Sequence, residues 1–273
     1  MAATGYLLAG QLSELERLQL QSRVWEPSGR ALLVHLGAGQ GLRALDVGCG
    51  CLGWLRVLSQ WVGSQGTVTG TDVDDRLLDA ARTLIAQERL TNVTLLKGDL
   101  FESRLAAGKY DLVHARFEIG PLGRADEQLA SYLRLVASGG WVILEDPDLG
   151  SWHFNPPAPG AERLIQLLQD AFLAGGGDLN AGRRQAEVMR ASGLEPEVRA
   201  EVQALPPGHP YLRLPVQFSV SLEPRLLRLV SRAELEELRR MAEAEIAQPG
   251  RWGTTFTLVQ TWARVSHDVP RKG

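Results

Sequence analysis

The chain has 273 residues, of which 44% are hydrophobic and 22% charged, and this suits one sizeable core, or one core with a subdomain. Its net charge of -3 lacks the basic excess that binding to a phosphate backbone requires, so a nucleic-acid partner is disfavoured. No apolar run approaches the roughly 18 residues of a membrane span, and no signal peptide is evident. We therefore expect a cytoplasmic protein that does not contact a membrane.

The amino-terminal part of the chain is predicted to be helical. Leucines recur at helical spacing in residues 11–36, and Pro27 suits the first turn of a helix. This pattern predicts two helices with a bend between them, and we assign residues 1–40 to an amino-terminal helical segment.

Short β-rich runs then alternate with helical stretches up to residue 146. Such alternation is typical of βαβ units in a mainly parallel, doubly wound sheet with helices on both faces, which makes the fold class α/β. The predicted strands are 43–47, 67–72, 93–98, 110–115 and 141–146, with predicted helices at 52–62, 74–89 and 124–137.

The pattern changes after Asp146, where the chain becomes rich in proline and glycine. Further helices are predicted at 161–173, from Asn180 to Ser192, and at 231–247, with strands at 193–205 and 254–265. The main domain then covers 41–265, with a helical cap inserted at about 206–250 and a tail at 266–273.

Residues 44–54, ALDVGCGCLGW, contain three glycines spaced G-x-G-x-x-G. This spacing alone is weak evidence for a dinucleotide site, because glycines also serve tight strand-to-helix turns. Asp46 precedes the first glycine, and its carboxylate would repel a pyrophosphate but suit a ligand with an ammonium group. An NAD-dependent oxidoreductase is therefore the least favoured class.

Two further acids follow predicted strands. Asp72 stands where a carboxylate can accept hydrogen bonds from ribose hydroxyls, and Asp99 where one can accept the amino group of adenine beside Leu100. Ligands of such sheets bind at the carboxyl ends of the strands, so the three acids describe a nucleoside with a positively charged tail. The cysteines at 49 and 51 lack further ligands at metal spacing, and no metal is expected.

The successive motifs LDVGCGCLG, GTDVDD, KGDLF and YDLVHARF resemble those of the class I S-adenosylmethionine-dependent methyltransferases, in particular a small-molecule branch similar to quinone methyltransferases. The resemblance covers roughly residues 42–146. It implies a seven-stranded, mostly parallel Rossmann-like sheet with an antiparallel last strand, which the run at 254–265 fits. It also implies that an amino-terminal helical lid closes over S-adenosylmethionine as the cofactor.

The resemblance assigns site residues by position. It implies that Gly48 and Gly50 approach the methionine part of the cofactor, that Asp46 faces its ammonium group, Asp72 the ribose, and Asp99 with Leu100 the adenine. Further cofactor neighbours are expected at Tyr6, Gln21, Val73, Ala115 and Arg116. Related sequences often have a histidine near Gly120 or Pro121, which this chain lacks.

A catalytic base therefore has to be sought elsewhere. His153 follows the fifth predicted strand and has a suitable pKa, although a loop histidine bonded to the backbone is an equally good interpretation. The aromatic residues expected to line an acceptor pocket, with plain core packing as the alternative, are Trp152, Phe154, Tyr211 and Phe218.

The predicted function is transfer of a methyl group from S-adenosylmethionine to an O, N or C atom of a small organic acceptor. Only three of the 29 basic residues are lysines, a bias typical of a GC-rich bacterial genome, and bacterial secondary metabolism is the expected context. The alternatives are a methyltransferase for protein or RNA and a non-catalytic cofactor-binding protein. The sequence leaves a homodimer open.

Overall fold

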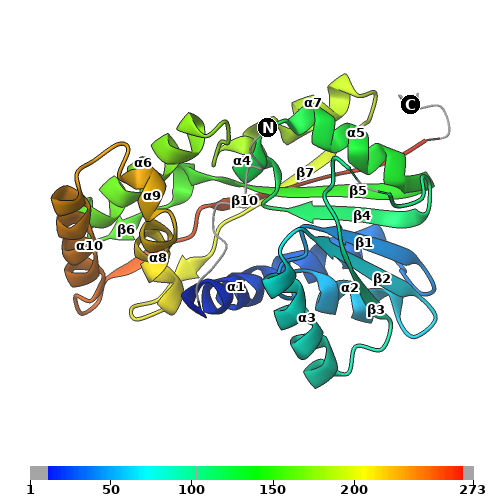
Figure 1. Ribbon diagram of the computed structural model, residues 1–273, viewed down its shortest axis with the longest axis horizontal. Coiled ribbons are helices and arrows are strands. Elements are labelled where there is room, and N and C mark those ends of the chain that lie inside the picture. Colours follow the sequence, from blue (N-terminus) through cyan, green and yellow to red (C-terminus); the bar gives the residue numbers. More distant parts are fainter. Residues whose placement is uncertain (1–11, 103, 267–273) are drawn as a thin grey trace.

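A computed structural model describes residues 12–102 and 104–266, and its centre is one large twisted sheet (Figure 1). The sheet has seven strands in the order β3-β2-β1-β4-β5-β10-β7. Six strands run in the same direction, and β10 runs antiparallel to both of its neighbours, as predicted. The strands are β1 (Arg43–Val47), β2 (Thr67–Asp72), β3 (Val93–Lys97), β4 (Tyr110–Arg116), β5 (Val136–Asp148), β7 (Glu197–Glu201) and β10 (Thr257–Arg264).

The central strand β1 fixes where the carboxyl ends of its neighbours lie. Asp46 is in register with Gly70 of β2 on one side and with His114 of β4 on the other. Parallel neighbours end at the same edge of a sheet, so the turns after β1, β2 and β4 are brought together there. This register is what places the acids that follow separate strands around one site.

Helices link these strands along the chain. The helices that follow the strands of the sheet are α2 (Leu55–Val62), α3 (Asp75–Glu88), α4 (Ile119–Leu122), α5 (Ala125–Leu135) and α7 (Gln185–Ala191), with single 3-10 turns η1 (Leu149–Ser151) and η2 (Ala181–Arg184).

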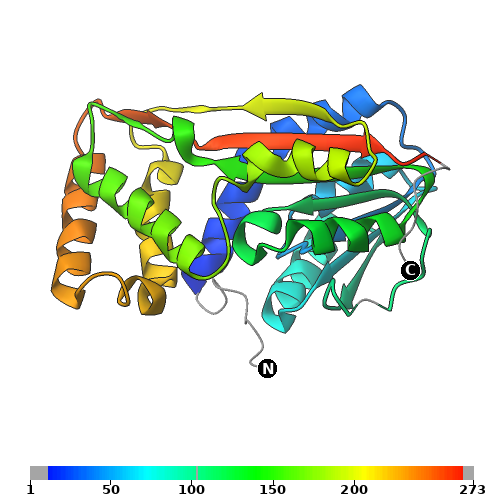
Figure 2. The ribbon, with the colours of Figure 1, turned by 90° about the horizontal axis from the view of Figure 1, so that it is seen from above.

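The amino-terminal segment differs from the prediction in one respect. Residues Leu12–Leu36 form one helix, α1, with Pro27 inside it, and not two helices with a bend. Proline removes one backbone N–H, but α1 buries Trp25, Leu32 and Leu33 against the rest of the molecule, and this packing outweighs the lost hydrogen bond. The helix runs between the sheet and the cap helices (Figures 1 and 2).

A second group of elements lies beyond one end of the sheet (Figure 2). Helix α6 (Pro159–Ala174) packs against α10 (Arg232–Ile246) and α8 (Leu214–Ser221), beside η3 (Pro210–Arg213) and α9 (Glu223–Leu226). We call α8, α9 and α10 the cap helices. A small antiparallel sheet of β6 (Phe154–Asn155), β9 (Trp252–Thr254) and β8 (Ala204–Leu205) connects this group to β10.

Two further predictions need correction. The run 193–205 is not one strand, because β7 joins the large sheet while β8 joins the small one. Asn180 does not cap a helix with its side chain; its Oδ1 accepts the backbone N–H of Leu149 at 2.8 Å, and a 3-10 turn intervenes before α7. In residues 12–102 and 104–266 no helix combines the length and apolarity needed to cross a membrane.

Candidate active site

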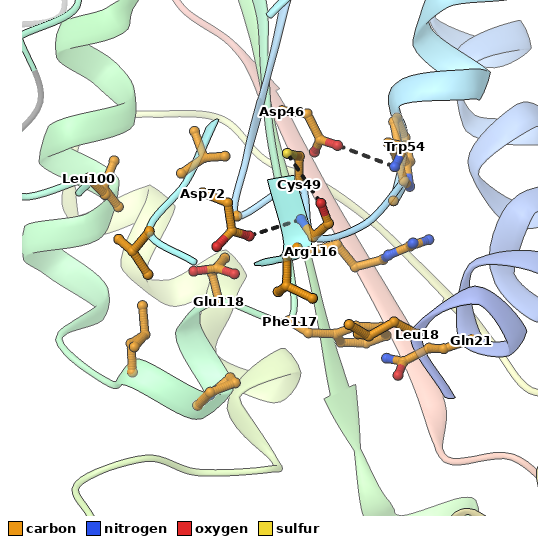
Figure 3. Close-up of a pocket in the computed structure, with 18 of the residues that line it drawn as sticks. Leu18, Gln21, Asp46, Cys49, Trp54, Asp72, Leu100, Arg116, Phe117 and Glu118 are labelled. Atoms are coloured by element: carbon orange, nitrogen blue, oxygen red, sulfur yellow. Dashed lines mark hydrogen bonds between the residues drawn. The ribbon is translucent and has the colours of Figure 1, made fainter. Parts of the chain in front are cut away.

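A cavity of about 480 Å³ lies at the carboxyl ends of β1, β2 and β4, with one wall formed by α1 (Figure 3). Parallel sheets of this kind bind ligands at this edge, and the volume suits a small-molecule ligand. One part of the cavity is lined by glycines and acidic side chains, and another by aromatic rings.

The glycine turn after β1 forms the floor of the acidic part. Gly48 and Gly50 have φ angles of 64° and 56°, which glycine adopts at low cost. The turn is attached to β2 by a hydrogen bond from Cys49 N to the Thr71 carbonyl at 2.9 Å. A β-carbon at position 48 would lie 2.0 Å from Glu118 Oε1, so a larger residue would displace the Glu118 carboxylate.

Asp46 supports this turn from beneath. Its Oδ2 accepts the Trp54 backbone N–H at 3.2 Å, and its Oδ1 lies 2.7 Å from His114 Nδ1. The His114 ring stacks on Trp54 with centroids 3.8 Å apart, and its Nε2 is 3.4 Å from Glu145. Asp46 lines the cavity, but both of its oxygens already have protein partners.

Asp46, His114 and Glu145 form a buried hydrogen-bonded network, and their charges stabilise one another. Burial lowers the pKa of His114, but hydrogen bonds with the two carboxylates outweigh this effect and hold the pKa above its ordinary value. Burial raises the pKa of Glu145, but the hydrogen bond with His114 brings it below its usual range. Arg116 extends this network, with its Nε 3.9 Å from Glu145.

Asp72 is hydrogen-bonded to the glycine turn at the cavity wall. Its Oδ2 accepts the Gly50 backbone N–H at 3.0 Å and its Oδ1 that of Asp74 at 2.9 Å. Burial raises the pKa of this carboxyl, and the two backbone donors oppose the rise. A carboxylate has about four acceptor positions, so Asp72 retains capacity for ligand hydroxyls.

The structure brings most of the predicted cofactor residues to this cavity. Asp99, whose Oδ1 accepts the Phe101 N–H at 2.8 Å, lies at the far end of the acidic part. Ala115 is not among the lining residues; it is a buried residue of β4. Tyr6 lies outside the described residues. The predicted cofactor residues that line the cavity are Gln21, Asp46, Gly48, Gly50, Asp72, Val73, Asp99, Leu100 and Arg116.

The predicted aromatic residues divide into two groups. Trp152 and Phe218 line the cavity, whereas Phe154 and Tyr211 are buried without lining it. The Tyr211 hydroxyl accepts a hydrogen bond from Trp25 Nε1 at 3.2 Å, which makes it a link between the cap and α1. Phe256 was not predicted, yet it lines the cavity, and the rings of Phe117, Trp25, Trp152 and Tyr211 surround it.

His153 does not line the cavity. Strand β5 continues to Asp148 and a 3-10 turn follows; Trp152 still lines the cavity after this turn, but the next residue, His153, does not. The imidazole is exposed, and its Nε2 is 3.0 Å from the Gly150 carbonyl oxygen, the backbone pairing that was the alternative interpretation. The structure gives no support for His153 as a base.

Sequence reasoning also missed Arg17, Leu18 and Glu118, which line the cavity. Arg17 and Leu18 come from α1, where the helical pattern gives no sign of which face meets a ligand. Arg17 is paired with Glu14 at 2.6 Å. Glu118 lies in the segment HARFEIGPL, and the signal that could have found it is an acid directly after a strand, as for Asp72 and Asp99.

The donors and acceptors of the acidic part fit S-adenosylmethionine. Gly48 and Gly50 keep the turn free of side chains at the cavity wall, Asp72 keeps free acceptor positions, and the carboxylates suit a ligand with positive charge. Asp99, Leu100 and Phe101 provide an acceptor and apolar surface for a purine at the other end.

Comparison with known proteins agrees with this geometry. Residues 44–140 match a family model described as methyltransferase domain. The chain is 32% identical over 133 residues to an aklanonic acid methyltransferase, DauC, of Streptomyces sp. (strain C5), covering 48% of this chain and 60% of that protein. It is 31% identical over 123 residues to a demethylmenaquinone methyltransferase of Staphylococcus aureus, covering 45% and 49%. The chain thus spans about half to three fifths of these relatives.

Solved structures show the same fold. A methyltransferase described as SAM dependent, from Aquifex aeolicus, superposes with a TM-score of 0.55 at 20% identity, covering 70% of this chain and 92% of that one. A second methyltransferase, from Bacillus halodurans, gives a TM-score of 0.58 at 14% identity, covering 88% and 99%. Residues 44–140 thus match a methyltransferase domain, and the chain has the fold of solved methyltransferases, one of them described as SAM dependent.

Proposed function

We propose that the protein transfers a methyl group from S-adenosylmethionine to a small, ring-containing organic acceptor in bacterial secondary metabolism. The observation that carries this proposal is the division of one cavity into an acidic, glycine-lined part and an aromatic part. The first part suits the cofactor, and the second suits a flat apolar molecule. Two relatives are named as methyltransferases of aklanonic acid and of demethylmenaquinone, and these names support an acceptor of this kind.

The residues of the acidic part would hold the cofactor. Gly48 and Gly50 would let the backbone approach it, Asp72 would accept the ribose hydroxyls, and Asp99 the adenine amino group. Asp46 would fix the turn through Trp54 N and add negative charge towards the ammonium group. When bound, S-adenosylmethionine supplies an electrophilic methyl group on a positively charged sulfur.

The aromatic part would position the acceptor and exclude water. Trp152, Phe256 and Phe117 meet edge to face, with ring centroids 5.7 Å apart for both pairs that include Phe256. Phe218 of α8 adds a further ring, beneath the Arg17 guanidinium at 4.5 Å. Methyl transfer is an in-line displacement, so holding both reactants without solvent supplies much of the acceleration.

Calorimetric titration tests the cofactor assignment. We expect S-adenosylhomocysteine to bind the wild type, and Asp72→Asn to weaken that binding at least about tenfold, since ribose hydroxyls would lose a charged acceptor. Asp75→Asn is the matched control, because Asp75 lies in the same turn with its side chain 63% exposed. Absence of binding to the wild type, or binding of NADH in its place, would contradict the proposal.

The acceptor class needs a second experiment. Methyl-labelled S-adenosylmethionine is incubated with the protein and with a bacterial extract that has been separated into small-molecule, protein and RNA fractions. We expect label in the small-molecule fraction, because the aromatic rings line an internal cavity that suits a small molecule. Label confined to protein or RNA would identify a macromolecular methyltransferase.

A further inference from the structure

Glu118 is an acidic side chain in the acidic part of the cavity, and its geometry is defined by the turn after β4. It directly precedes α4, and the residue before it, Phe117, has a φ of 60°. Its Oε1 lies 2.0 Å from the position that a β-carbon on Gly48 would take, so the carboxylate rests against the glycine turn. Figure 3 shows the Glu118 carboxylate close to Asp72.

The charged groups that shift the pKa of Glu118 are carboxylates, although Arg17, Arg116 and Arg124 also line the cavity. Burial raises the pKa of its carboxyl well above the ordinary value, and the nearby carboxylates raise it further. In residues 14–102 and 104–266 no hydrogen bond or ion pair is made by its carboxylate oxygens. The titratable groups that face it are Asp46 of β1, Cys49 of the glycine turn, Asp72 of β2, Tyr132 of α5 and Asp146 of β5.

A carboxylate in this position costs folding free energy unless a cation reaches it. Each neighbouring acid has partners of its own: Asp46 has His114 and Trp54 N, Asp72 has two backbone donors, and Asp146 has Gly120 N and Gln185. Glu118 is therefore the carboxylate in this group whose partner would have to come from a ligand.

We propose that Glu118 is a charge contact for the positively charged sulfur of the cofactor and a determinant of the preference for S-adenosylmethionine over S-adenosylhomocysteine. The inference rests on the proposed function. Loss of the methyl group turns a positively charged sulfur into a neutral thioether, so an unpaired carboxylate at this wall favours the methyl donor over the product. The same interaction assists product release, since the spent cofactor lacks the charge that Glu118 binds.

The test compares three ligands by calorimetric titration: S-adenosylmethionine, S-adenosylhomocysteine, and sinefungin, which carries an amine in place of the methylated sulfur. We expect Glu118→Gln to weaken binding of the two cationic ligands by on the order of tenfold, and that of S-adenosylhomocysteine by less than about threefold. Glu102→Gln is the matched control, because Glu102 lines the same cavity but is exposed, and it should leave the ratio unchanged.

A measurement on the wild type gives an independent test that needs no variant. Arrival of a cation makes ionisation of Glu118 easier, so binding of S-adenosylmethionine should release more protons than binding of S-adenosylhomocysteine. The difference appears when binding enthalpies are compared in buffers with different ionisation enthalpies. Glu118→Gln should remove it.

The outcomes separate this inference from the proposed function. If the wild type binds neither S-adenosylmethionine nor S-adenosylhomocysteine, both are overturned. If it binds both ligands but Glu118→Gln weakens them by the same factor, or the wild type releases equal numbers of protons, the cofactor site stands and the role of Glu118 is overturned. A loss of turnover with an unchanged ligand preference would also overturn it, since Glu118 would then serve the acceptor.

Discussion

Asp146, at the end of β5, is a buried acid whose ionisation affects the stability of the fold. Its oxygens accept the Gly120 N–H and the Gln185 Nε2 amide, each at 2.8 Å, and burial still raises its pKa from 3.8 to about 7. The folded state therefore binds a proton that the unfolded state has released, and stability falls as pH rises through this window. The protonated Asp146 carboxyl contributes roughly 2 to 4 kcal/mol to the free energy of unfolding at low pH, and this contribution is lost at high pH.

We predict that Asp146→Asn reduces this pH dependence. The difference in free energy of unfolding, variant minus wild type, should increase by roughly 2 to 4 kcal/mol between pH 4 and pH 8. The wild type loses stability over this range as Asp146 ionises, whereas the amide of the variant does not ionise. Urea denaturation across this range measures the difference, with Asp79→Asn as an exposed control. A difference between Asp146→Asn and wild type that stays constant from pH 4 to pH 8 would show that this carboxyl titrates normally.

Helix α1 is fixed to the molecule by a small number of large side chains. Trp25 is fully buried, its ring lies 5.4 Å from that of Phe256, and its Nε1 donates to Tyr211. We predict that Trp25→Ala lowers the free energy of unfolding by about 3 to 5 kcal/mol, because it leaves a cavity and an unpaired hydroxyl. Val34→Ala, at a position 79% exposed on the same helix, should change it by less than about 0.5 kcal/mol in the same urea titration.

Sequence patterns predicted elements better than the course of the loops between them. The helix expected at 231–247 is α10, and Ser231 caps it by accepting the Glu234 N–H. Asp72 and Asp99 could be placed because a strand end is visible locally in the sequence, and parallel register then brings such ends together. The predicted bend at Pro27 was wrong because it relied on local propensity, whereas burial of Trp25 stabilises one continuous helix.

The same reasoning explains which site residues could not be found. His153 has suitable chemistry, but only the length of β5 and the turn after it decide that it leaves the cavity. Tyr211 was predicted for the pocket from its residue type, and its hydrogen bond with Trp25 places it in the core. Phe256 follows β9 and is brought to the cavity by the small sheet, whose pairing spans about a hundred residues of sequence.

The large sheet and the cap helices share one hydrophobic core at the scale of the whole molecule. A single cluster of buried side chains contains Trp25 of α1, Leu168 of α6, Leu235 of α10 and Leu258 of β10. Because this cluster joins the cap helices to α1 and β10, the cap helices bury their apolar faces against elements anchored in the large sheet. The cap and the sheet should therefore unfold together.

We predict one cooperative transition, with coincident midpoints for far-ultraviolet circular dichroism and tryptophan fluorescence. S-adenosylhomocysteine at about 100 times its dissociation constant should stabilise the protein by about 2.7 kcal/mol. Both signals should then shift upwards together, by roughly 5 to 10 °C. Hydrogen exchange should give core amides of α10 and β4 the same opening free energy, and both should rise with the ligand. Earlier melting of α10, with the β4 amides still protected, would contradict the shared core and would make the cap an independently folding unit.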